Sequence, residues 1–366
     1  MDVLLQTKKL THALTIVSRV VGKKESLPVL SCILFKTGKG GVTLQATNLE
    51  SGISYFVPAK IEAEGTVAVP AVTILQLFKN AQGEQVKLSV DGGVLLIKTN
   101  NGSARIKTIP HEEFPYLTPP KEGTPFTLPR TALIEGIRSV SYAASVSTIR
   151  PEFSSVFITQ KDDFLTFVST DSFRLAEKKI KHQDPGGIPD TLIPAKNASD
   201  ITYLLETIHE DSITCSITES QIHIETKDTS FMSRVIDAQF PDYESIIPKK
   251  PTTEALILKE DLSVLLQKAR AFAGQEQYIQ VHIYPQKKIY TATAQSDSIG
   301  EMDEQMEVAA SGEDVDIKFN ISYIHDALQS FGTDSVKMNF FGQGKPLVMQ
   351  GAPNTGFTYL VMPLNR

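Results

Sequence analysis

The first 21 residues, MDVLLQTKKLTHALTIVSRVV, decide the fold, because the pattern that they set returns twice along the chain. Residues 1–6 predict a short apolar strand. Residues 9–21 predict an amphipathic helix, in which Leu10, Leu14 and Val17 recur at helical spacing. The same strand and helix are expected again at 126–128 with 131–144 and at 255–258 with 261–274.

A second strand that runs into a second helix follows in each copy, at 67–69 with 72–80, 191–193 with 198–208 and 315–319 with 323–331. The copies close on the phrases FPYL (114–117), FPDY (240–243) and VMPL (361–364). A repeat of this length is a whole domain with its own core, and not a solenoid unit. We therefore predict three similar domains, at 1–124, 125–250 and 251–366.

Each domain divides again into two β-α-β-β-β units, which gives six units along the chain. In the first copy, strands are expected at 29–36, 42–46 and 52–58 after the first helix, and at 86–90, 94–99 and 104–109 after the second. Asp-Gly and Asn-Gly turns at 91–92 and 101–102 separate alternating runs, which is a strong hairpin signal. The fold class is therefore α+β.

Composition places the chain among ordinary globular proteins, with 41% apolar and 21% charged residues. No apolar run approaches the ~18 residues of a membrane span, and the N-terminus has no signal-peptide core. Cys32 and Cys215 lie in apolar contexts of different copies, which favours buried free thiols over a disulfide. Such thiols fit a reducing cytoplasm, so we expect a cytoplasmic protein.

The net charge of −6 is unevenly distributed. Residues 1–24 hold five basic side chains against one acidic side chain, whereas residues 300–316 hold seven acidic and no basic ones. A charge run is most often a solvated face. The segregation still allows one positive surface, near the helices, on an acidic protein.

We find no motif that carries chemistry. The chain lacks a phosphate-binding Gly-x-x-x-x-Gly-Lys-Ser/Thr loop, a His-Glu-x-x-His pair and a Cys-x-x-Cys pair. The seven histidines are scattered, and the adjacent carboxylates at 112–113 and 162–163 are better explained as turn residues. We expect no catalytic residue, no metal and no cofactor. A hydrolase on a β-rich scaffold would need convergent titratable groups, which the sequence does not offer.

Four phrases now carry a resemblance that spans the chain: LPVLSCIL (27–34), ATNLE (46–50), STDSFRLA (169–176) and FPDY (240–243), with MPL at 362–364. Together with the threefold repeat they resemble the bacterial DNA polymerase III beta subunit, the sliding clamp family. The resemblance implies a head-to-tail homodimer that closes a six-domain ring around duplex DNA. It also implies a non-catalytic processivity factor that binds the replicative polymerase, the clamp loader and repair proteins. A β-rich interaction scaffold that does not encircle DNA is the alternative.

The resemblance further implies a pocket between the second and third domains that receives short linear motifs of the partners. The matching positions are Phe153, Thr170, Ser172, Phe173, Arg174, Leu175, Pro241, Ser245, Ile246, Tyr278, Asn320, Tyr323, Pro346, Met362, Pro363 and Leu364. Apolar and aromatic side chains with a few polar groups suit leucine and phenylalanine anchors. Phe173 stands where family members often carry a smaller or polar residue, and the chain ends in Asn365-Arg366.

Two more sets follow from the ring that the resemblance implies. The cations expected to face the phosphate backbone, with one histidine, are Lys9, His12, Arg19, Lys23, Lys24, Lys79, Arg138, Arg150, Lys196 and Lys268. The residues expected at the contact between two copies are Arg105, Ile106, Lys107, Phe272, Ala273 and Glu276. For single members the alternatives are a solvated surface cation and packing within one domain.

Overall fold

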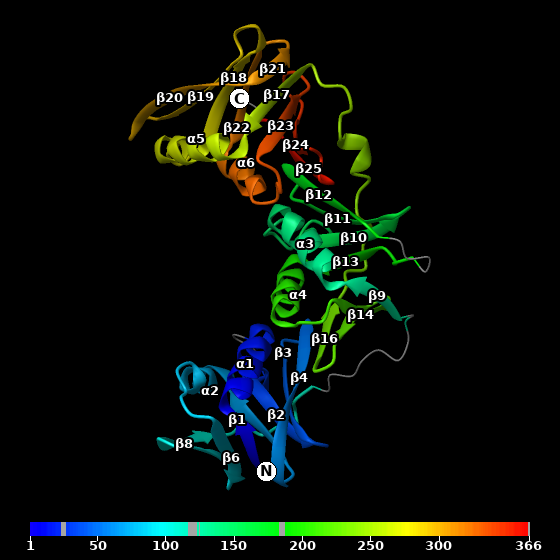
Figure 1. The fold of residues 1–366 in the computed structure, drawn as a ribbon, viewed down its shortest axis with the longest axis vertical. Coiled ribbons are helices and arrows are strands. Elements are labelled where there is room, and N and C mark those ends of the chain that lie inside the picture. Colours follow the sequence, from blue (N-terminus) through cyan, green and yellow to red (C-terminus); the bar gives the residue numbers. More distant parts are fainter. Residues whose placement is uncertain (23–26, 116–122, 124, 183–186, 365–366) are drawn as a thin grey trace. The chain divides into compact units, whose positions relative to one another are not determined.

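The structure is a computed structural model that describes residues 1–22, 27–115, 123, 125–182 and 187–364 (Figure 1). It divides into two compact units, which we describe separately. The first unit contains residues 1–133 and 199–235, and the second contains residues 134–198 and 236–366.

The described elements follow one another in groups of the order β-α-β-β-β. The first two groups are β1 (Asp2–Gln6), α1 (Thr7–Val17), β2 (Cys32–Gly38), β3 (Gly41–Thr47), β4 (Ser51–Ala63), and β5 (Thr66–Pro70), α2 (Ala71–Phe78), β6 (Gln85–Asp91), β7 (Val94–Thr99), β8 (Gly102–Lys107). The next two are β9 (Pro125–Pro129), α3 (Arg130–Val140), β10 (Ser155–Lys161), β11 (Phe164–Thr170), β12 (Arg174–Lys181), and β13 (Thr191–Pro194), α4 (Ala195–Thr207), β14 (Ser212–Ile217), β15 (Gln221–Glu225), β16 (Thr229–Arg234).

The last two groups contain one additional strand, β21. They are β17 (Thr253–Leu258), α5 (Lys259–Phe272), β18 (Tyr278–Tyr284), β19 (Ile289–Ser296), β20 (Gly300–Glu307), β21 (Ala309–Gly312), and β22 (Val315–Asn320), α6 (Ile321–Leu328), β23 (Ser335–Phe340), β24 (Leu347–Ala352), β25 (Phe357–Val361). The predicted α+β architecture of repeated β-α-β-β-β units is confirmed. The boundaries 1–124, 125–250 and 251–366 stay a prediction.

The two groups of each pair exchange their first strands. β1 extends the meander of the second group, in the order β8-β7-β6-β1, while β5 extends that of the first group, in the order β5-β2-β3-β4. The same exchange gives β16-β15-β14-β9 and β13-β10-β11-β12, then β25-β24-β23-β17 and β20-β19-β18-β22. A single group therefore cannot complete its own sheet.

Last strands of the groups also join neighbouring repeats. β4 pairs with β16, where Gly52 lies opposite Met232, and β12 pairs with β25, where Leu175 lies opposite Leu360. Both pairings are antiparallel and continue the sheet from one repeat into the next. Among the last strands that the structure describes, β8 and β20 have no such partner and keep one open edge.

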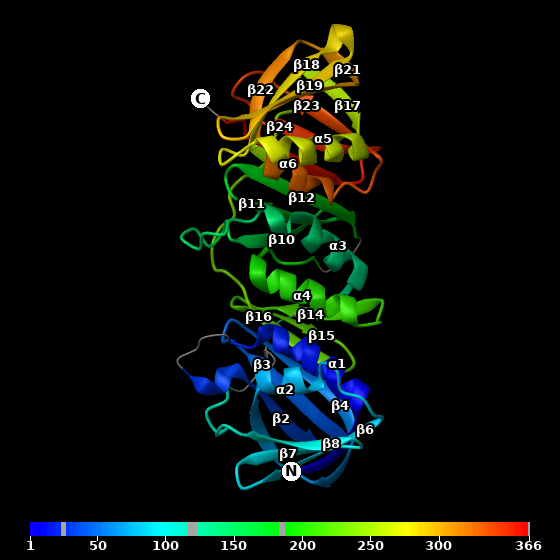
Figure 2. The same ribbon diagram turned by 90° about the vertical axis from the view of Figure 1, so that its left-hand side faces the viewer.

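Within each unit, taken by itself, the helices cover one face of the sheets (Figure 2). α1 shows why: Leu10, Leu14 and Val17 are fully buried, whereas Lys9 and His12 on the other side of the helix are exposed. In α5 the buried stripe is Leu262, Leu265, Leu266 and Ala269. The predicted helices are present, and α1 buries the predicted stripe, but the helix ends differ from the predicted ones by up to four residues.

Some predicted bounds were wrong, and Pro28 explains the clearest case. The strand expected at 29–36 begins only at Cys32, because Pro28–Ser31 form a 3₁₀ turn in which the Leu30 N–H donates to the Leu27 carbonyl at 3.1 Å. β4 is longer than expected, since it continues past its pairing with β3, which ends at Pro58, and residues 59–63 pair with β1. Of the phrase FPYL, Tyr116 and Leu117 lie outside the described residues.

Gly136 lets α3 lie directly on β11. A Cβ atom at this position would meet the ring of the fully buried Phe167 at 2.2 Å. We expect Gly136→Ala to lower the free energy of unfolding by about 1–3 kcal/mol, although alanine is the better helix former. Thermal and urea unfolding measure this. Gly332→Ala is the matched control, because a Cβ there meets nothing within 4 Å. Equal stability of the two variants would contradict the packing argument.

Candidate functional site

A rigid turn between β11 and β12 organises the candidate site in the second unit. The Thr170 hydroxyl accepts a hydrogen bond from the Ser172 N–H at 3.1 Å and donates one to the Arg174 carbonyl at 2.7 Å. One carboxylate oxygen of Asp171 accepts from the N–H groups of Phe173 and Arg174 at 2.9 and 3.0 Å. Ser172 has a left-handed φ of 77°. The turn therefore holds Phe173 outward, 61% exposed.

Arg174 is the centre of the site. Its guanidinium donates from Nε to Asp171 Oδ2 at 3.0 Å, from Nη1 to Asp326 Oδ2 at 2.8 Å and from Nη2 to the Tyr142 carbonyl at 2.7 Å. The Tyr323 ring lies 4.4 Å from the guanidinium carbon. A planar guanidinium with paired donors and a stacked ring has little freedom left. Arg174 thus fixes the turn, α6 and the end of α3 in one arrangement.

Two buried tyrosines support this centre. Burial raises the pKa of Tyr142 and of Tyr359 above the usual tyrosine range, so both phenols stay protonated. The Tyr359 hydroxyl donates to the Tyr323 carbonyl at 2.7 Å. The Ser330 hydroxyl lies 3.2 Å from the Tyr142 hydroxyl and donates to the Ser139 carbonyl at 3.0 Å. The base of the site is therefore neutral and closely hydrogen-bonded.

The segment after β25 forms one side of the site. The Met362 N–H donates to the Phe173 carbonyl at 2.8 Å, and the Leu364 N–H donates to the Lys318 carbonyl at 2.9 Å. The side chains of Phe173, Met362 and Leu364 are all exposed. Three large apolar side chains on a fixed backbone form a surface suited to an apolar ligand.

The third side comes from β18, β22 and α6. Tyr278 lies opposite Asn320 in the sheet, and Lys318 Nζ lies 4.7 Å from the centre of the Tyr278 ring. The Asn320 side chain accepts the Tyr323 N–H at 3.2 Å and so caps α6. This places an aromatic ring, a lysine and an amide beside the apolar surface.

The structure thus joins part of the predicted peptide-binding set through described contacts: Thr170, Ser172, Phe173, Arg174, Met362, Leu364, Tyr278, Asn320 and Tyr323. Leu175 is a core residue packed with Val168 and Leu360, and Phe153 is buried beneath Arg150. In the described ranges, no hydrogen bond, ion pair or ring contact joins Arg174 to the side chains of Pro241, Ile246, Pro346 and Pro363. The Ser245 hydroxyl donates only to the nearby Asp242 carbonyl. Peptide binding by the set stays a prediction.

Sequence reasoning missed Asp171, Tyr142, Lys318, Asp326 and Tyr359. Asp171 lies inside the quoted STDSFRLA phrase, so its turn position could have been found. Asp326 is 152 residues from Arg174 and carries no local signal. Contacts of that separation follow from the fold and not from a motif.

Several candidates for DNA contact take part in ion pairs. Arg19 lies 3.6 Å from the buried Asp200 and stacks on Tyr203, Arg150 pairs with Glu152 at 2.9 Å, and Lys268 pairs with Glu304 at 2.7 Å. Lys9, His12, Lys79, Arg138 and Lys196 are exposed, on or directly after helices, and Lys23 and Lys24 lie outside the described residues. Contact of these residues with DNA stays a prediction.

The candidates for the contact between copies also differ among themselves. Arg105 and Lys107 are exposed on β8, whereas Ile106 between them is only 7% exposed and packs into the core of its own repeat. At the end of α5, Ala273 is buried, Phe272 is half-buried and Glu276 is exposed. Arg105, Lys107, Phe272 and Glu276 therefore have surface to offer to a second copy.

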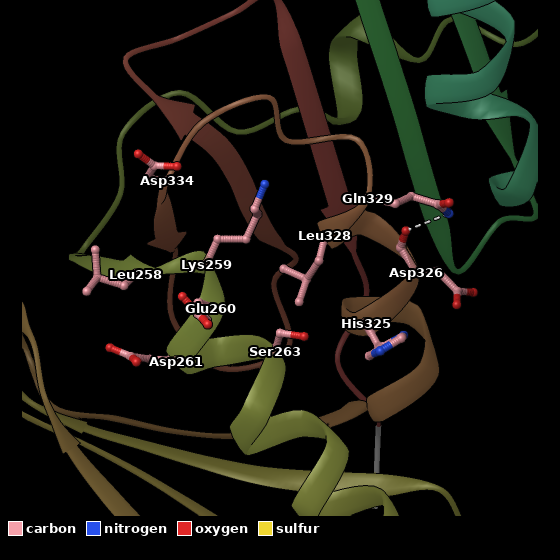
Figure 3. Close-up of a pocket in the computed structure, with 10 residues that line it drawn as sticks. All are labelled: Leu258, Lys259, Glu260, Asp261, Ser263, His325, Asp326, Leu328, Gln329 and Asp334. Carbon is pink, nitrogen blue, oxygen red and sulfur yellow. Dashed lines mark hydrogen bonds between the residues drawn. The ribbon is translucent and has the colours of Figure 1, made fainter.

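A further hollow of about 800 Å³ lies between the start of α5 and the end of α6 (Figure 3). Its lining includes the carboxylates of Glu260, Asp261, Asp326 and Asp334. Lys259 also lines it and donates to the Phe331 carbonyl at 2.9 Å. In the ranges that the structure describes, no three acidic, histidine or cysteine side chains are grouped to hold a metal ion. The sequence did not point to this hollow.

Neither cysteine has the environment of a reactive thiol. Burial raises the pKa of Cys32, and burial raises that of Cys215 to about 12, so both thiols stay protonated. Among the described helices none has the length and apolarity needed to cross a membrane.

Comparison with known proteins decides the family. Family models of the DNA polymerase III beta subunit match residues 1–118 with the N-terminal domain, 127–242 with the central domain and 244–365 with the C-terminal domain. The chain belongs to the DNA polymerase III beta subunit family. The predicted resemblance to the sliding clamps and the three-domain fold are therefore confirmed.

Named relatives and solved structures of the family match along the whole chain. The beta sliding clamp of Proteus mirabilis is 25% identical over 100% of both chains, and that of Escherichia coli K12 is 23% identical over 98% of both. The Thermotoga maritima beta subunit superimposes with a TM-score of 0.94 at 28% identity, covering 100% of this chain and 99% of its own. A Pseudomonas aeruginosa clamp bound to griselimycin has a TM-score of 0.93 at 23% identity over 100% of both chains.

Proposed function

We propose that this member of the sliding-clamp family works as a homodimeric ring that encircles duplex DNA and tethers a DNA polymerase to its template. The ring is a non-enzymatic processivity factor without cofactors. It holds the duplex through sequence-independent phosphate contacts. The surface around Arg174 receives short linear motifs of the polymerase, the clamp loader and repair proteins. A reducing cytoplasm suits the two buried thiols.

One observation carries the ring: the rule by which neighbouring repeats join. At both junctions within the chain, the last strand of a repeat's first group pairs with the last strand of the next repeat's second group, as β4 does with β16 and β12 with β25. β20, the last strand of the third repeat's first group, and β8, the last strand of the first repeat's second group, are the two strands left without such a partner. Applying the rule once more pairs β20 of one copy with β8 of another, which is a head-to-tail contact. Such a heterologous contact closes a ring when the rotation fits.

The charges of the two open edges support this pairing. Arg105 and Lys107 are exposed on β8, and Glu301 and Asp303 are exposed on β20. The alternate residues of these strands, such as Ile106, turn into the core. A basic edge and an acidic edge attract each other, while two copies of the same edge repel. The pairing also covers two strand edges that would otherwise invite aggregation.

The helix ends repeat the same junction rule. Arg19, after α1, pairs with Asp200 of α4, and the Tyr142 carbonyl, after α3, binds the same guanidinium as Asp326 of α6. Both aspartates are the sixth residue of their helices. The sixth residue of α2 is Gln76, and no aspartate is available there.

A hollow of mixed character lies beside α2 in place of that aspartate. It has a volume of about 350 Å³. The exposed Leu77 lines it together with Phe78, Ala81, Ile97 and Ala104, and with the polar residues Asn80, Gln82, Thr99, Asn101 and Ser103. The junction rule brings the end of α5 in a second copy to this place, so the half-buried Phe272 is the side chain to fill it. The contact between copies would then be apolar where the junctions within the chain are ionic.

We expect retention on DNA to come from topology and not from affinity. The ring should bind a short linear duplex weakly, and it should lose this binding steeply as salt rises from about 50 to 200 mM, as phosphate contacts do. Once a clamp loader has placed it on nicked circular plasmid, it should stay at salt that abolishes linear binding. Gel filtration of the complexes measures this, and cutting the circle is the control. Equal loss from circle and cut circle would contradict the encircling ring.

A further inference from the structure

The exposed charge of the helices is concentrated on α1. Its exposed residues are Lys8, Lys9, His12 and Thr15, and the helix contains no acidic residue. In the ranges that the structure describes, the side chains of Lys8 and Lys9 form no ion pair and no hydrogen bond. Both ammonium groups are therefore available to a ligand from outside the chain.

The other helices expose no excess of positive charge. Among their exposed residues, α3 carries Glu135 and Arg138, α4 carries Lys196 and Glu206, α5 carries Glu260, Asp261, Lys268 and Arg270, and α2 carries the uncharged Val72, Thr73, Gln76 and Leu77. In α6 the acidic Asp326 is half-exposed, beside His325. Opposite charges on one helix face cancel at the distance of a bound polyanion. Among the described helices, only α1 therefore has an exposed face whose charges are all positive.

The position of the lysines disfavours a purely structural role. Lys8 and Lys9 lie in the first turn of α1, which has no acidic residue and no side-chain cap. Positive charge near a helix N-terminus opposes the helix dipole and destabilises the helix. α5 follows the ordinary rule, with Glu260 and Asp261 in its first turn and Arg270 in its last. Residues that destabilise a helix locally, without any need in the fold, are typical of a binding surface.

The base beneath this face is rigid. Leu10, Ala13 and Leu14 are fully buried, and Arg19 ties the end of the helix to Asp200 and Tyr203 of α4. The lysines therefore stand on a fixed helix, while their own stems are long and mobile. Point charges on flexible stems attract phosphate oxygens without reading bases. This combination suits a partner that must slide.

We infer that the α1 face, formed by Lys8, Lys9 and His12, is the principal contact for the sugar-phosphate backbone of duplex DNA. The duplex is then held against one helix of each copy and not evenly by all the helices. Lys8 joins the contact residues, and the cations of α5 contribute little. This inference rests on the proposed function and sharpens it.

The test compares three double substitutions that each remove two positive charges from each chain. K8Q/K9Q changes the α1 face, K268Q/R270Q changes α5, and K36Q/K39Q changes two exposed lysines of the β2–β3 hairpin as the control. Fluorescence anisotropy with a short linear duplex gives the affinity at graded salt. We expect K8Q/K9Q to bind about tenfold or more weakly at 50 mM salt. Its slope of log affinity against log salt should fall by about 4, because each of the two copies loses two phosphate contacts. The other two variants should change by less than threefold.

Each outcome decides the inference. An equal loss in the α1 and α5 variants would overturn it in favour of contacts spread over all the helices. An equal loss in all three variants would overturn it in favour of net charge alone. Unchanged thermal unfolding of K8Q/K9Q excludes a folding defect, because both side chains are exposed. Retention of the unsubstituted ring on circular plasmid is measured separately, so failure of the clamp function is told apart from failure of the α1 contact.

Discussion

Reversing both cations of β8, with Arg105→Glu and Lys107→Glu, should convert the dimer into folded monomers. The change sets two carboxylates against Glu301 and Asp303 on the β20 edge of the second copy. Like charges across an antiparallel pair repel, and we expect a cost of about 3 kcal/mol, which is about a hundredfold in the Kd of the dimer. Sedimentation equilibrium measures the mass, and loading on circular plasmid should be lost with the ring.

A charge exchange gives this prediction a direct control. Glu301→Lys with Asp303→Lys reverses the acidic edge and should also yield monomers. When the two variants are mixed, each contact of the ring joins opposite charges again, so a heterodimer should form. A dimer that survives either reversal, or a mixture that stays monomeric, would overturn the β8–β20 contact.

The buried state of Ile106 changes how the interface should be tested. Ile106→Asp with Phe272→Asp is the direct test of the interface residues that the sequence predicts. Ile106 is packed into its own repeat opposite Leu95, so an aspartate there would unfold the strand and obscure the result. Exposed Arg105 and Lys107 avoid this problem. Phe272→Asp alone is the useful apolar counterpart.

The second large effect is expected at the Arg174 surface. Phe173→Glu with Met362→Glu should lower the affinity for a short peptide with leucine and phenylalanine anchors about a hundredfold. Two exposed apolar contacts are lost and two charges face an apolar ligand. Isothermal titration with a synthetic peptide measures the loss. The hydrogen bonds of the turn use backbone groups of Phe173, so the fold should be unaffected.

The matched control lies elsewhere in the same sheet. Phe164 is an exposed phenylalanine at the opposite end of β11 from Thr170, and Leu256 is an exposed apolar residue of β17. Phe164→Glu with Leu256→Glu makes the same chemical change away from the Arg174 surface. Equal loss of peptide affinity in both pairs would show that the effect is not local and would refute the site.

The repeated architecture could be predicted because its signals are local. Buried apolar stripes such as Leu10, Leu14 and Val17 mark helices, and Asp-Gly or Asn-Gly marks hairpins, within a few residues. The exchange of β1 and β5 between two groups could not be predicted. Both groups have the same pattern, so strand pairing with either meander satisfies the sequence equally well, and only tertiary packing selects one.

The turn at the centre of the candidate site was predictable, and its electrostatics were not. The phrase STDSFRLA located the turn, and its family resemblance indicated the function. Apart from Asp171, the partners of Arg174 come from two distant segments, one with Tyr142 and one with Tyr323 and Asp326. Likewise, Arg19 reads as a free surface cation in the sequence. In the structure Arg19 pairs with Asp200, which lies 181 residues further along the chain. Only the fold brings the two side chains together.

The exchanged strands also constrain how the protein is made. During synthesis β1 is the first strand to leave the ribosome, yet Leu5 pairs with Val86 as well as with Ala59, so one edge of β1 stays open until the sixth strand has emerged. Contacts of such long sequence separation slow folding and lengthen the time in which strand edges are exposed. A nascent chain that ends between the two groups therefore leaves β1 without β6 and β2 without β5.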